Sequence, residues 1–282
     1  MPGTPAIKRS INMGTLAQGS DDSIIGGANG STPYRIFNAP PTALWAGAPA
    51  LGDNEVSRYF FFEEDCLMQG SATALNGTTW TDMKSTGGTN AFQNVAGGVY
   101  NMVTSTTNDD YRGIRTTAKN WLFASGKEHW FEAAFTIAEG QTNLSSWVVG
   151  FMDTFTTGGL QAGNAGPLAN FSGAVIFKAG GGMAAKLMTS NGATQNTSAT
   201  IATVVTNQKI RVGMYFDGTA TTGNVYPYVD IGDGKGWVAG ASQTITLAGL
   251  NAMSLVATVK CGGSGTTAET MQLDYIACQA IR

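Results

Sequence analysis

The segment Lys127–Ile137, "KEHWFEAAFTI", decides the fold class. Alternate residues from His129 to Ile137 form an apolar set, and the intervening residues from Trp130 to Thr136 form a mixed set. A repeat of two residues is typical of a β-strand with one face in the core. The segment therefore predicts a half-buried strand that begins just after the turn "SGKE".

The same segment carries His129, the only histidine in the chain. A histidine titrates near neutral pH and can act as a general base or bind a metal ion. Either role needs a partner nucleophile, a carboxylate or further ligands, and no such motif accompanies it. We therefore expect a histidine that is satisfied locally at the start of a strand.

The chain after residue 56 repeats this pattern many times. About twelve to fourteen short strands separated by Gly-rich turns predict an all-β, antiparallel architecture. We expect a two-sheet antiparallel jelly-roll sandwich over residues 57–282. The best candidate for a helix is the segment "AKNWLFAS", residues 118–125.

Composition limits the function. Charged residues make up 12% of the chain, about half of the ~25% usual in soluble proteins. The net charge of −3 gives no basic surface for nucleic acid. The sequence contains no apolar run of about 18 residues, so no membrane span is expected. The start of the chain lacks the apolar core of a signal peptide. Few charges and many small polar residues favour a surface that packs against other proteins.

Residues 1–56 differ from the rest and are expected to form an extended N-terminal arm. This segment holds six of the eight prolines, and its apolar residues come in short clusters without a helical or strand period. It cannot bury enough apolar surface by itself to offset its ordering entropy. We expect its apolar residues to anchor it on partner subunits, the alternative being that it lies on its own domain. The expected anchors are Ile7, Ile11, Ile24, Ile25, Ile36, Phe37, Leu44 and Trp45.

The three cysteines are Cys66, Cys261 and Cys278. Their odd number and the absence of a C-x-x-C spacing predict neither a disulfide framework nor a zinc site. Cys66 and Cys278 fall in the first and last expected strands and are predicted to be close in space. We expect buried free thiols, because a chain without a signal peptide is made in the reducing cytoplasm.

Several strand patterns resemble those of bacteriophage virion proteins with a concanavalin-like (laminin-G-like) jelly roll. These are "YFFFEEDCL" (59–67), "GKEHWFEAAFTI" (126–137), "SSWVVGFMDT" (145–154), "IRVGMYFDG" (210–218), "YVDIGDGKGWV" (228–238) and "MQLDYIACQAIR" (271–282). The resemblance covers about residues 57–282. It implies the fold, and it implies a role in decorating or cementing the capsid, or in head fibres or tails.

This fold class also includes glycoside hydrolases, which need a pair of carboxylates for catalysis. Glu63 and Asp65 are two residues apart and face the same way, but the pattern E-x-D-x-x-E of the retaining enzymes is absent. We expect a solvated strand edge and no catalysis. Closely spaced aspartates, Asp230 with Asp233 and Asp109 with Asp110, can supply calcium ligands, but Asp-Gly is also a common turn pair. We expect turns without metal.

Neither a phosphate-binding loop nor a nucleophile elbow is present in the sequence, and no cofactor is expected. Five aromatic residues are expected to pack in the core or between subunits, the alternative being that they stack on sugars. These residues are Trp130, Trp147, Tyr226, Tyr228 and Trp237.

These observations favour a phage capsid decoration (cement) protein on the outer surface of the virion. The expected partners are the major capsid protein and neighbouring copies of the chain, with a homotrimer as the expected oligomer. The alternative is a lectin-like module of a head or tail fibre that binds host glycans. An enzyme that cleaves glycans is the third and least favoured hypothesis.

Overall fold

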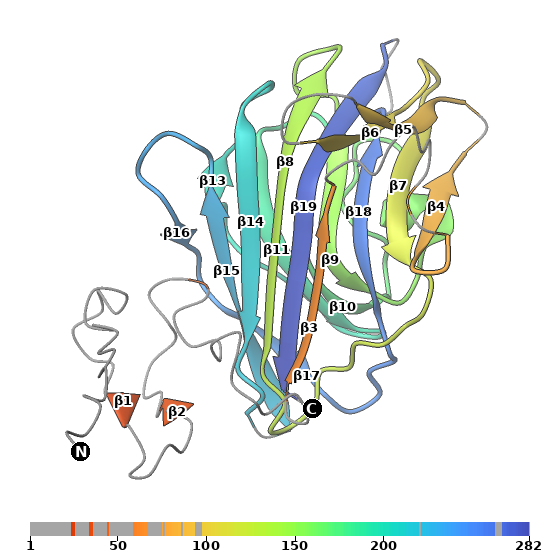
Figure 1. Ribbon diagram of the computed structural model, residues 1–282. Helices are drawn as coiled ribbons and strands as arrows, with labels where there is room; N and C mark the ends of the chain where they lie inside the picture. Colours follow the sequence, from red (N-terminus) through yellow and green to blue (C-terminus); the bar gives the residue numbers. More distant parts are fainter. Residues whose placement is uncertain are drawn as a thin grey trace, which may run out of the picture.

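The computed structural model describes residues 24–25, 34–35, 44, 59–66, 75, 77–85, 87–93, 98–219, 221–262 and 267–281. Within these residues two antiparallel β-sheets pack face to face, as Figure 1 shows. The only helical element among them is one 3-10 turn, η2 (Thr156–Gly159). The described part of the chain contains no helix that is long and apolar enough to span a membrane. The predicted all-β jelly-roll sandwich is therefore confirmed.

The first sheet has eight strands among the described residues, in the order β12-β11-β10-β9-β18-β7-β4, with β13 paired to β11. Their bounds are β4 (Trp80–Lys84), β7 (Tyr111–Thr116), β9 (Ser146–Met152), β10 (Ser172–Lys178), β11 (Ala184–Asn191), β12 (Gln195–Thr197), β13 (Ala202–Thr203) and β18 (Ser254–Lys260). Strands β9, β10 and β18 are buried along their whole length.

The second sheet has nine described strands, in the order β16-β15-β14-β8-β19-β6-β5, with β17 paired to β15 and β3 to β19. Their bounds are β3 (Tyr59–Asp65), β5 (Thr89–Gln93), β6 (Val99–Val103), β8 (His129–Glu139), β14 (Lys209–Phe216), β15 (Thr222–Asp230), β16 (Val238–Ala239), β17 (Gln243–Thr246) and β19 (Glu269–Ile281). Strands distant in sequence, such as β8 and β19, run side by side in Figure 1.

Strand β8 contains most of the segment from which the fold was predicted. Phe131 and Phe135 point into the core between the sheets, where Phe131 packs on Phe151 and Phe135 on Trp147 of β9. The other face of β8 is also covered, because Trp130 and Glu132 are buried as well. The prediction of a strand is right, but the expectation that one face is open to solvent is wrong.

The predicted helix at residues 118–125 does not form. Trp121 makes a β-bridge with Met253, and Ala124 makes one with Lys127. Trp121 and Phe123 are buried while Leu122 between them is 45% exposed, which is the two-residue alternation of an extended chain. Burial of two rings against the core therefore overrides the weak local helix propensity.

The outer face of the eight-stranded sheet is covered by the chain between β9 and β10. Leu160 and Phe171 from this connection form a buried apolar cluster with residues of the sheet such as Val148 and Val256. An apolar sheet face must be covered by another element, since its exposure to water is unfavourable. The nine-stranded sheet meets the same requirement on its outer face in a different way, described below.

Of the predicted arm anchors, only Leu44 has a described side chain. Ile24 and Ile25 form the short strand β1 (Ile24–Ile25), whose backbone pairs with β2 (Tyr34–Arg35), and their side chains lie outside the described residues. The remaining anchors also lie outside the described residues, and these are Ile7, Ile11, Ile36, Phe37 and Trp45.

Lys260, at the end of β18, is fully buried. Its ammonium group donates to the carboxylate of Asp109 (2.8 Å) and to the carbonyl oxygens of Gln161 and Gly163, the latter at 2.7 Å. The same Asp109 oxygen accepts from the backbone N–H of Gly163 (2.7 Å). Lys260 therefore fixes two loops to the end of the eight-stranded sheet.

We predict that Lys260→Met lowers the free energy of unfolding by about 3 kcal/mol, since it leaves a carboxylate and two carbonyl groups without their donor. The matched control is Lys235→Met, which breaks the exposed Lys235–Asp233 pair and should leave the stability nearly unchanged. Urea unfolding of both variants measures the difference. Equal losses in the two variants would contradict the assigned role of Lys260.

Candidate functional site

The outer face of the nine-stranded sheet places side chains from five strands in cross-strand rows. In the central row Glu63 of β3, Ala277 of β19, Glu132 of β8, Gly213 of β14 and Tyr228 of β15 are successive neighbours. Residues directly opposite each other in antiparallel strands point to the same face. Two residues of this row, Ala277 and Gly213, have small side chains or none, which leaves space above the sheet at their positions.

An aromatic row lies beside it. Trp130 of β8 is opposite Tyr215 of β14, which in turn is opposite Tyr226 of β15. The rings of Trp130 and Tyr215 have centroids 5.4 Å apart, and those of Tyr215 and Tyr226 are 5.8 Å apart and nearly parallel. Trp130, Tyr215 and Tyr228 are buried, whereas Tyr226 remains partly exposed.

Leu44 covers these rings. Its side chain is fully buried in a cluster with Trp130, Tyr215 and Tyr228. A Cβ atom at Gly213 would lie 2.1 Å from Leu44 Cδ2, so the missing side chain of Gly213 provides the space that Leu44 occupies. We call this contact the Leu44 seat. Full burial of a leucine side chain contributes about 1.5–3 kcal/mol.

The sequence predicts Leu44 as an anchor of the arm on a partner subunit, and that role stays a prediction. In the structure Leu44 packs on the sheet of its own chain. The physical reason is that the outer face of β8 and β14 is apolar at Trp130 and Gly213 and must be covered. The alternative that the arm lies on its own domain holds at this residue.

A charged network adjoins the seat. Arg211 Nε and Nη2 each lie 3.0 Å from Glu132 Oε1, which also accepts from the hydroxyl group of Tyr275. The Arg211 guanidinium lies 3.5 Å from Asp230 and stacks over the ring of Trp237 at 4.4 Å from its centroid. Arg211 is 38% exposed and Trp237 is partly exposed, so these groups are accessible from solvent.

A second polar group lies at the other end of the aromatic row. The hydroxyl group of Tyr215 donates to Glu128, and burial raises the pKa of the Glu128 carboxyl group. Asp217 accepts from the side-chain amide of Asn224 (2.8 Å) and from the backbone N–H of Asn224 (3.0 Å). The aromatic row is thus flanked by fixed donors and acceptors at both ends.

A buried ionic cluster lies at one end of the sandwich. The ammonium group of Lys178 donates to Glu139 Oε1 (2.7 Å) and to the carbonyl oxygen of Ser145 (2.7 Å). Glu139 Oε2 accepts from the backbone N–H of Asn143 (2.7 Å). Burial alone would raise the pKa of Glu139, but its hydrogen bonds from Lys178 and Ser145 outweigh burial, and the net pKa is lowered.

Glu269 of β19 lies directly opposite Glu139. It is fully buried, Oε2 accepts from the backbone N–H of Gly140 (3.1 Å), and Oε1 has no hydrogen-bond partner among the described residues. Burial, helped by the nearby Glu139 charge, raises its pKa to about 7. The pKa of Glu139 is therefore lower than that of an ordinary glutamate, whereas the pKa of the neighbouring Glu269 is higher.

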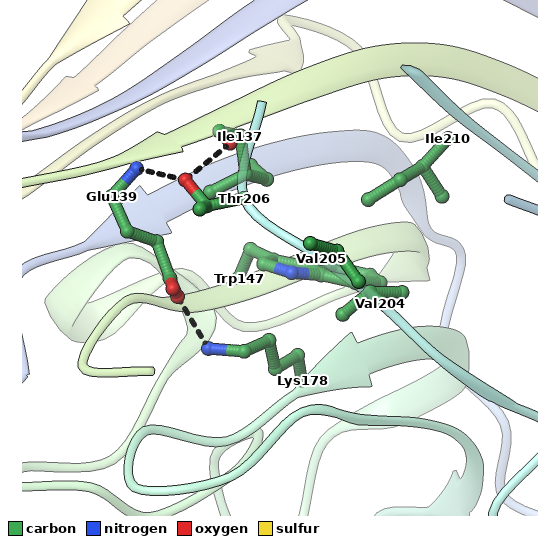
Figure 2. A pocket seen from close by; sticks show the side chains of 8 residues that line it. All are labelled: Ile137, Glu139, Trp147, Lys178, Val204, Val205, Thr206 and Ile210. Atoms are coloured by element: carbon green, nitrogen blue, oxygen red, sulfur yellow. Dashed lines mark hydrogen bonds and ion pairs between the residues drawn. The ribbon is translucent and has the colours of Figure 1, made fainter. Parts of the chain in front are cut away.

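The cluster borders a small pocket between the sheets, shown in Figure 2. Figure 2 also shows the Lys178–Glu139 pair on one side of the Trp147 indole and the side chains of Val204 and Val205 on the other. The pocket leaves room for about one water molecule. It is too small for a sugar ring, so the outer face is the better candidate for ligand binding.

The histidine prediction agrees with the structure. His129 is buried among Trp121, Phe123, Phe151 and Phe216. Its Nδ1 donates to the carbonyl oxygen of Lys127 (3.0 Å). Burial lowers its pKa to about 4. The imidazole is therefore neutral at physiological pH and packs as an aromatic ring.

Glu63 and Asp65 are both exposed on β3, as expected for a solvated strand edge. The intervening Glu64 faces the other side and accepts from the indole N–H of Trp80 (2.9 Å). Within the described residues no group of three or more His, Cys, Asp or Glu side chains is arranged to share a metal ion.

The aspartates considered as calcium ligands have protein partners. Asp233 pairs with Lys235 (2.7 Å), Asp230 accepts from the backbone N–H of Gly232 (2.8 Å), and Asp109 binds Lys260. Asp110 accepts from the backbone N–H of Ser105. All four carboxylates therefore accept hydrogen bonds from groups in turns or loops of the protein.

The three cysteines are free and buried, as predicted. Burial raises the pKa of the Cys66 thiol to about 12, which keeps it protonated. Cys278 is opposite Phe62 and Cys66 follows the end of β3, so both lie at the pairing of β3 with β19.

Four of the five aromatic residues considered for sugar stacking are brought together. Trp130, Tyr226, Tyr228 and Trp237 lie on the outer face, while Trp147 lies between the sheets. The packing role expected for these residues is confirmed for Trp130, Trp147 and Tyr228, which are buried within the chain.

Residues 210–218 are among the strand patterns of the sequence, but these patterns do not identify Arg211, Gly213 or Tyr215 as part of a site. The available signal was the glycine itself, because a glycine inside a strand often marks the close approach of another group. The identity of that group was not readable, since Leu44 is distant in sequence from Gly213.

We predict that Glu269→Gln stabilises the protein at pH 8 but has little effect at pH 5. The native pKa of about 7 lies above the ordinary 4.5, so the folded state holds this proton more tightly and stability falls as pH rises between these values. Glu139→Gln is the matched control with the opposite sign. Its pKa is lowered, so this variant should lose stability at pH 8.

Thermal unfolding of both variants from pH 5 to pH 8 measures the two effects. A destabilised Glu269→Gln variant at pH 8 would contradict the assigned buried, partly protonated state of Glu269.

No protein-family model matches the chain, and no curated protein sequence matches it. Solved structures with the same fold do match. A basic winged bean lectin crystallised with Tn-antigen aligns with a TM-score of 0.55 and 10% identity over 79% of this chain and 98% of the lectin. Peanut lectin aligns with a TM-score of 0.51 and 10% identity over 79% of this chain and 97% of the lectin.

A protein of unknown function from Shewanella oneidensis is also similar, with a TM-score of 0.53 and 17% identity over 79% of this chain and 87% of that protein. At these identities the likeness concerns the fold alone. The two-sheet sandwich of this chain is thus of the concanavalin-like jelly-roll type also found in legume lectins.

Proposed function

We propose that this chain is a non-catalytic carbohydrate-binding module and that the outer face of its nine-stranded sheet is the recognition surface. The observation that carries the proposal is the convergence of partly exposed rings, Tyr226 and Trp237, with the charged pair of Arg211 and Asp230. Sugars are bound by aromatic faces that stack on the ring and by polar groups that fix the hydroxyls. The lectin-like fold is consistent with this role.

The polar groups suit neutral sugars. Arg211 is flanked by two carboxylates, Glu132 and Asp230, so the patch has no excess of positive charge for a phosphate or nucleic acid. Their mutual pairing fixes the donors and acceptors in place before a ligand arrives, which reduces the entropic cost of binding.

Glycan-array binding followed by titration with the best glycan tests the proposal. We expect Trp237→Ala to lower the affinity at least about tenfold, as removal of an aromatic anchor usually does. Leu122→Ala is the control, because it removes an exposed apolar side chain elsewhere. Unfolding temperatures of both variants show whether the fold is intact. Failure of the wild-type protein to bind any glycan would refute the proposal.

A second candidate function is decoration of a phage capsid, with the chain on the virion surface bound to the major capsid protein and to copies of itself as a homotrimer. It is favoured by the low fraction of charged residues, 12%, which suits a surface that packs against other proteins. It is also favoured by the composition of residues 1–56. Many weak contacts around a symmetry axis would act together in such a setting.

We predict for this second function that deletion of residues 1–43 abolishes co-sedimentation with purified shells. This deletion keeps Leu44 and therefore the contact on the outer face. The thermal transition of the truncated protein, expected to match that of the full chain, serves as the control. Undiminished co-sedimentation would refute the role of the arm in shell binding.

A further inference from the structure

We propose that the chain carries a second binding site, on the outer side of its eight-stranded sheet, for the carboxylate or sulfate group of an acidic polysaccharide. The site consists of Arg115, Lys119 and Phe155, with the hydroxyl groups of Thr81 and Thr117 beside them. It lies on the opposite side of the sandwich from the surface proposed for neutral sugars, and it does not depend on that function.

Arg115 lies on the outer face of strand β7, near one edge of the sheet. It is opposite Val256 of β18, which belongs to the buried apolar cluster of this face, and opposite Thr81 of β4 on its other side. Phe155, from the connection between β9 and β10, is a partly exposed ring packed against the same cluster. Strands β7 and β4 lie side by side at the margin of the sandwich in Figure 1. The cation, the hydroxyl group and the ring thus come from separate segments of the chain.

The first observation is that two cations converge on one ring. The guanidinium carbon of Arg115 lies 4.7 Å from the centroid of the Phe155 ring, and Lys119 Nζ lies 5.7 Å from it. Neither cation forms an ion pair with a carboxylate of the described residues. Two like charges repel each other, and the attraction of a partly exposed ring for each of them is weak. An anion bound beside both cations would remove this repulsion.

The second observation is that nearby carboxylates are engaged elsewhere. Arg211, on the other sheet, also stacks over a ring, but it is paired with two carboxylates. Near Phe155 the acidic residue closest in sequence is Asp153. Its Oδ1 accepts from the backbone N–H of Ser172 (2.7 Å), and its Oδ2 accepts from the side-chain amide of Asn251 (2.9 Å). The positive charge beside Phe155 therefore remains for an external anion.

The third observation is that Arg115 has a free edge. Its Nη1 donates to the carbonyl oxygens of Thr116 and Thr117, each at 3.2 Å. Its Nε and Nη2 make no hydrogen bond within the described part of the chain. These two N–H groups form the edge that binds two oxygens of a carboxylate or sulfate side by side. Because the ring and the two carbonyls fix the guanidinium plane, little side-chain freedom is lost on binding.

Hydroxyl groups complete the site. Thr81 Oγ1 and Thr117 Oγ1 are 2.9 Å apart and share one hydrogen bond at the surface, so one of the two hydroxyl hydrogens is left for a ligand. Thr81 and Arg115 are directly opposite in their strands, which places their Cβ atoms about 5 Å apart. Two cations and one ring match a single acidic sugar residue, with an apolar face and one anionic group. A nucleic acid would need a longer row of phosphate contacts.

Isothermal titration with a heparin-derived hexasaccharide and with hexagalacturonate tests the proposal and separates sulfate from carboxylate recognition. We expect the wild-type protein to bind at least one of them, and Arg115→Gln to lower that affinity about tenfold through the loss of charge-assisted hydrogen bonds. Arg115→Lys keeps the charge without the paired donors and should restore only part of the affinity. Lys119→Gln should lose several-fold.

The matched control is Lys84→Gln. Lys84 is an exposed cation on β4, but it follows Met83, which faces the apolar cluster, and so it points away from the outer face. Its removal changes the net charge of the protein as much as Arg115→Gln does, and it should leave the affinity unchanged. Unfolding temperatures of all variants show whether the fold is intact, and Lys119→Gln alters only an exposed side chain.

Equal weakening by Lys84→Gln and Arg115→Gln would show attraction by net charge alone and would overturn the site. Failure of the wild-type protein to bind either acidic hexasaccharide would overturn it as well. Tighter binding of a single-stranded hexanucleotide, lost in Arg115→Gln, would overturn the assignment to an acidic polysaccharide. Trp237→Ala should leave acidic binding unchanged, and Arg115→Gln should leave neutral-glycan binding unchanged, so the failure of one function is distinguishable from the failure of the other.

Discussion

The structure depends on one constraint: strands β8 and β14 carry large side chains that are buried on both faces, so the nine-stranded sheet must be covered twice. On the inner face the second sheet supplies the cover through rings such as Phe151 and Trp147. On the outer face Trp130 is buried in a cluster with Leu44, Tyr215 and Tyr228. Exposure of such a ring is unfavourable in proportion to its apolar area. The contact between a residue before the sandwich and the sheet therefore follows from the sequence of the strands.

The outer faces of the two sheets are covered by different parts of the chain. The eight-stranded sheet is covered by the connection between β9 and β10, which contributes Leu160 and Phe171 to a buried cluster. Both ends of this connection are fixed by strands of the sheet. Among the described residues the outer face of the nine-stranded sheet is covered by Leu44, which lies earlier in the chain than every strand of the two sheets.

Much of the fold was readable from the sequence, because a two-residue repeat is a local property. The strand at His129 and the strand pattern at residues 210–218 are examples. The helix predicted at residues 118–125 failed because Trp121 and Phe123 are drawn into the core by contacts that no local pattern records. The candidate site was less predictable. Its rows depend on the register between β8, β14 and β15, which are separated by long connections in the chain.

The residues that evaded prediction share a physical character. Gly213, Glu132 and Glu269 are ordinary in sequence, and each becomes informative only through a neighbour from another strand. Gly213 leaves the space that Leu44 occupies, and Glu132 forms an ion pair with Arg211. Glu269 lies opposite Glu139 on the neighbouring strand. A lone glutamate in an alternating strand is normally a solvent-facing residue. Here two of them are buried, which a charge-poor chain tolerates only where pairing or protonation removes the cost of an isolated charge.

This distinction also bears on the two candidate functions. A surface built only for packing would be expected to satisfy its buried donors within the protein, as Lys260 and Lys178 do at the ends of the strands. Two buried indole N–H groups depart from that rule, Trp130 on the outer face and Trp147 between the sheets, and neither has a partner among the described residues. An unsatisfied buried donor has a modest energetic cost wherever it lies. Because the core and the outer face share this feature, the distinction between packing and binding depends on the accessible groups of the outer face, Arg211 and Trp237.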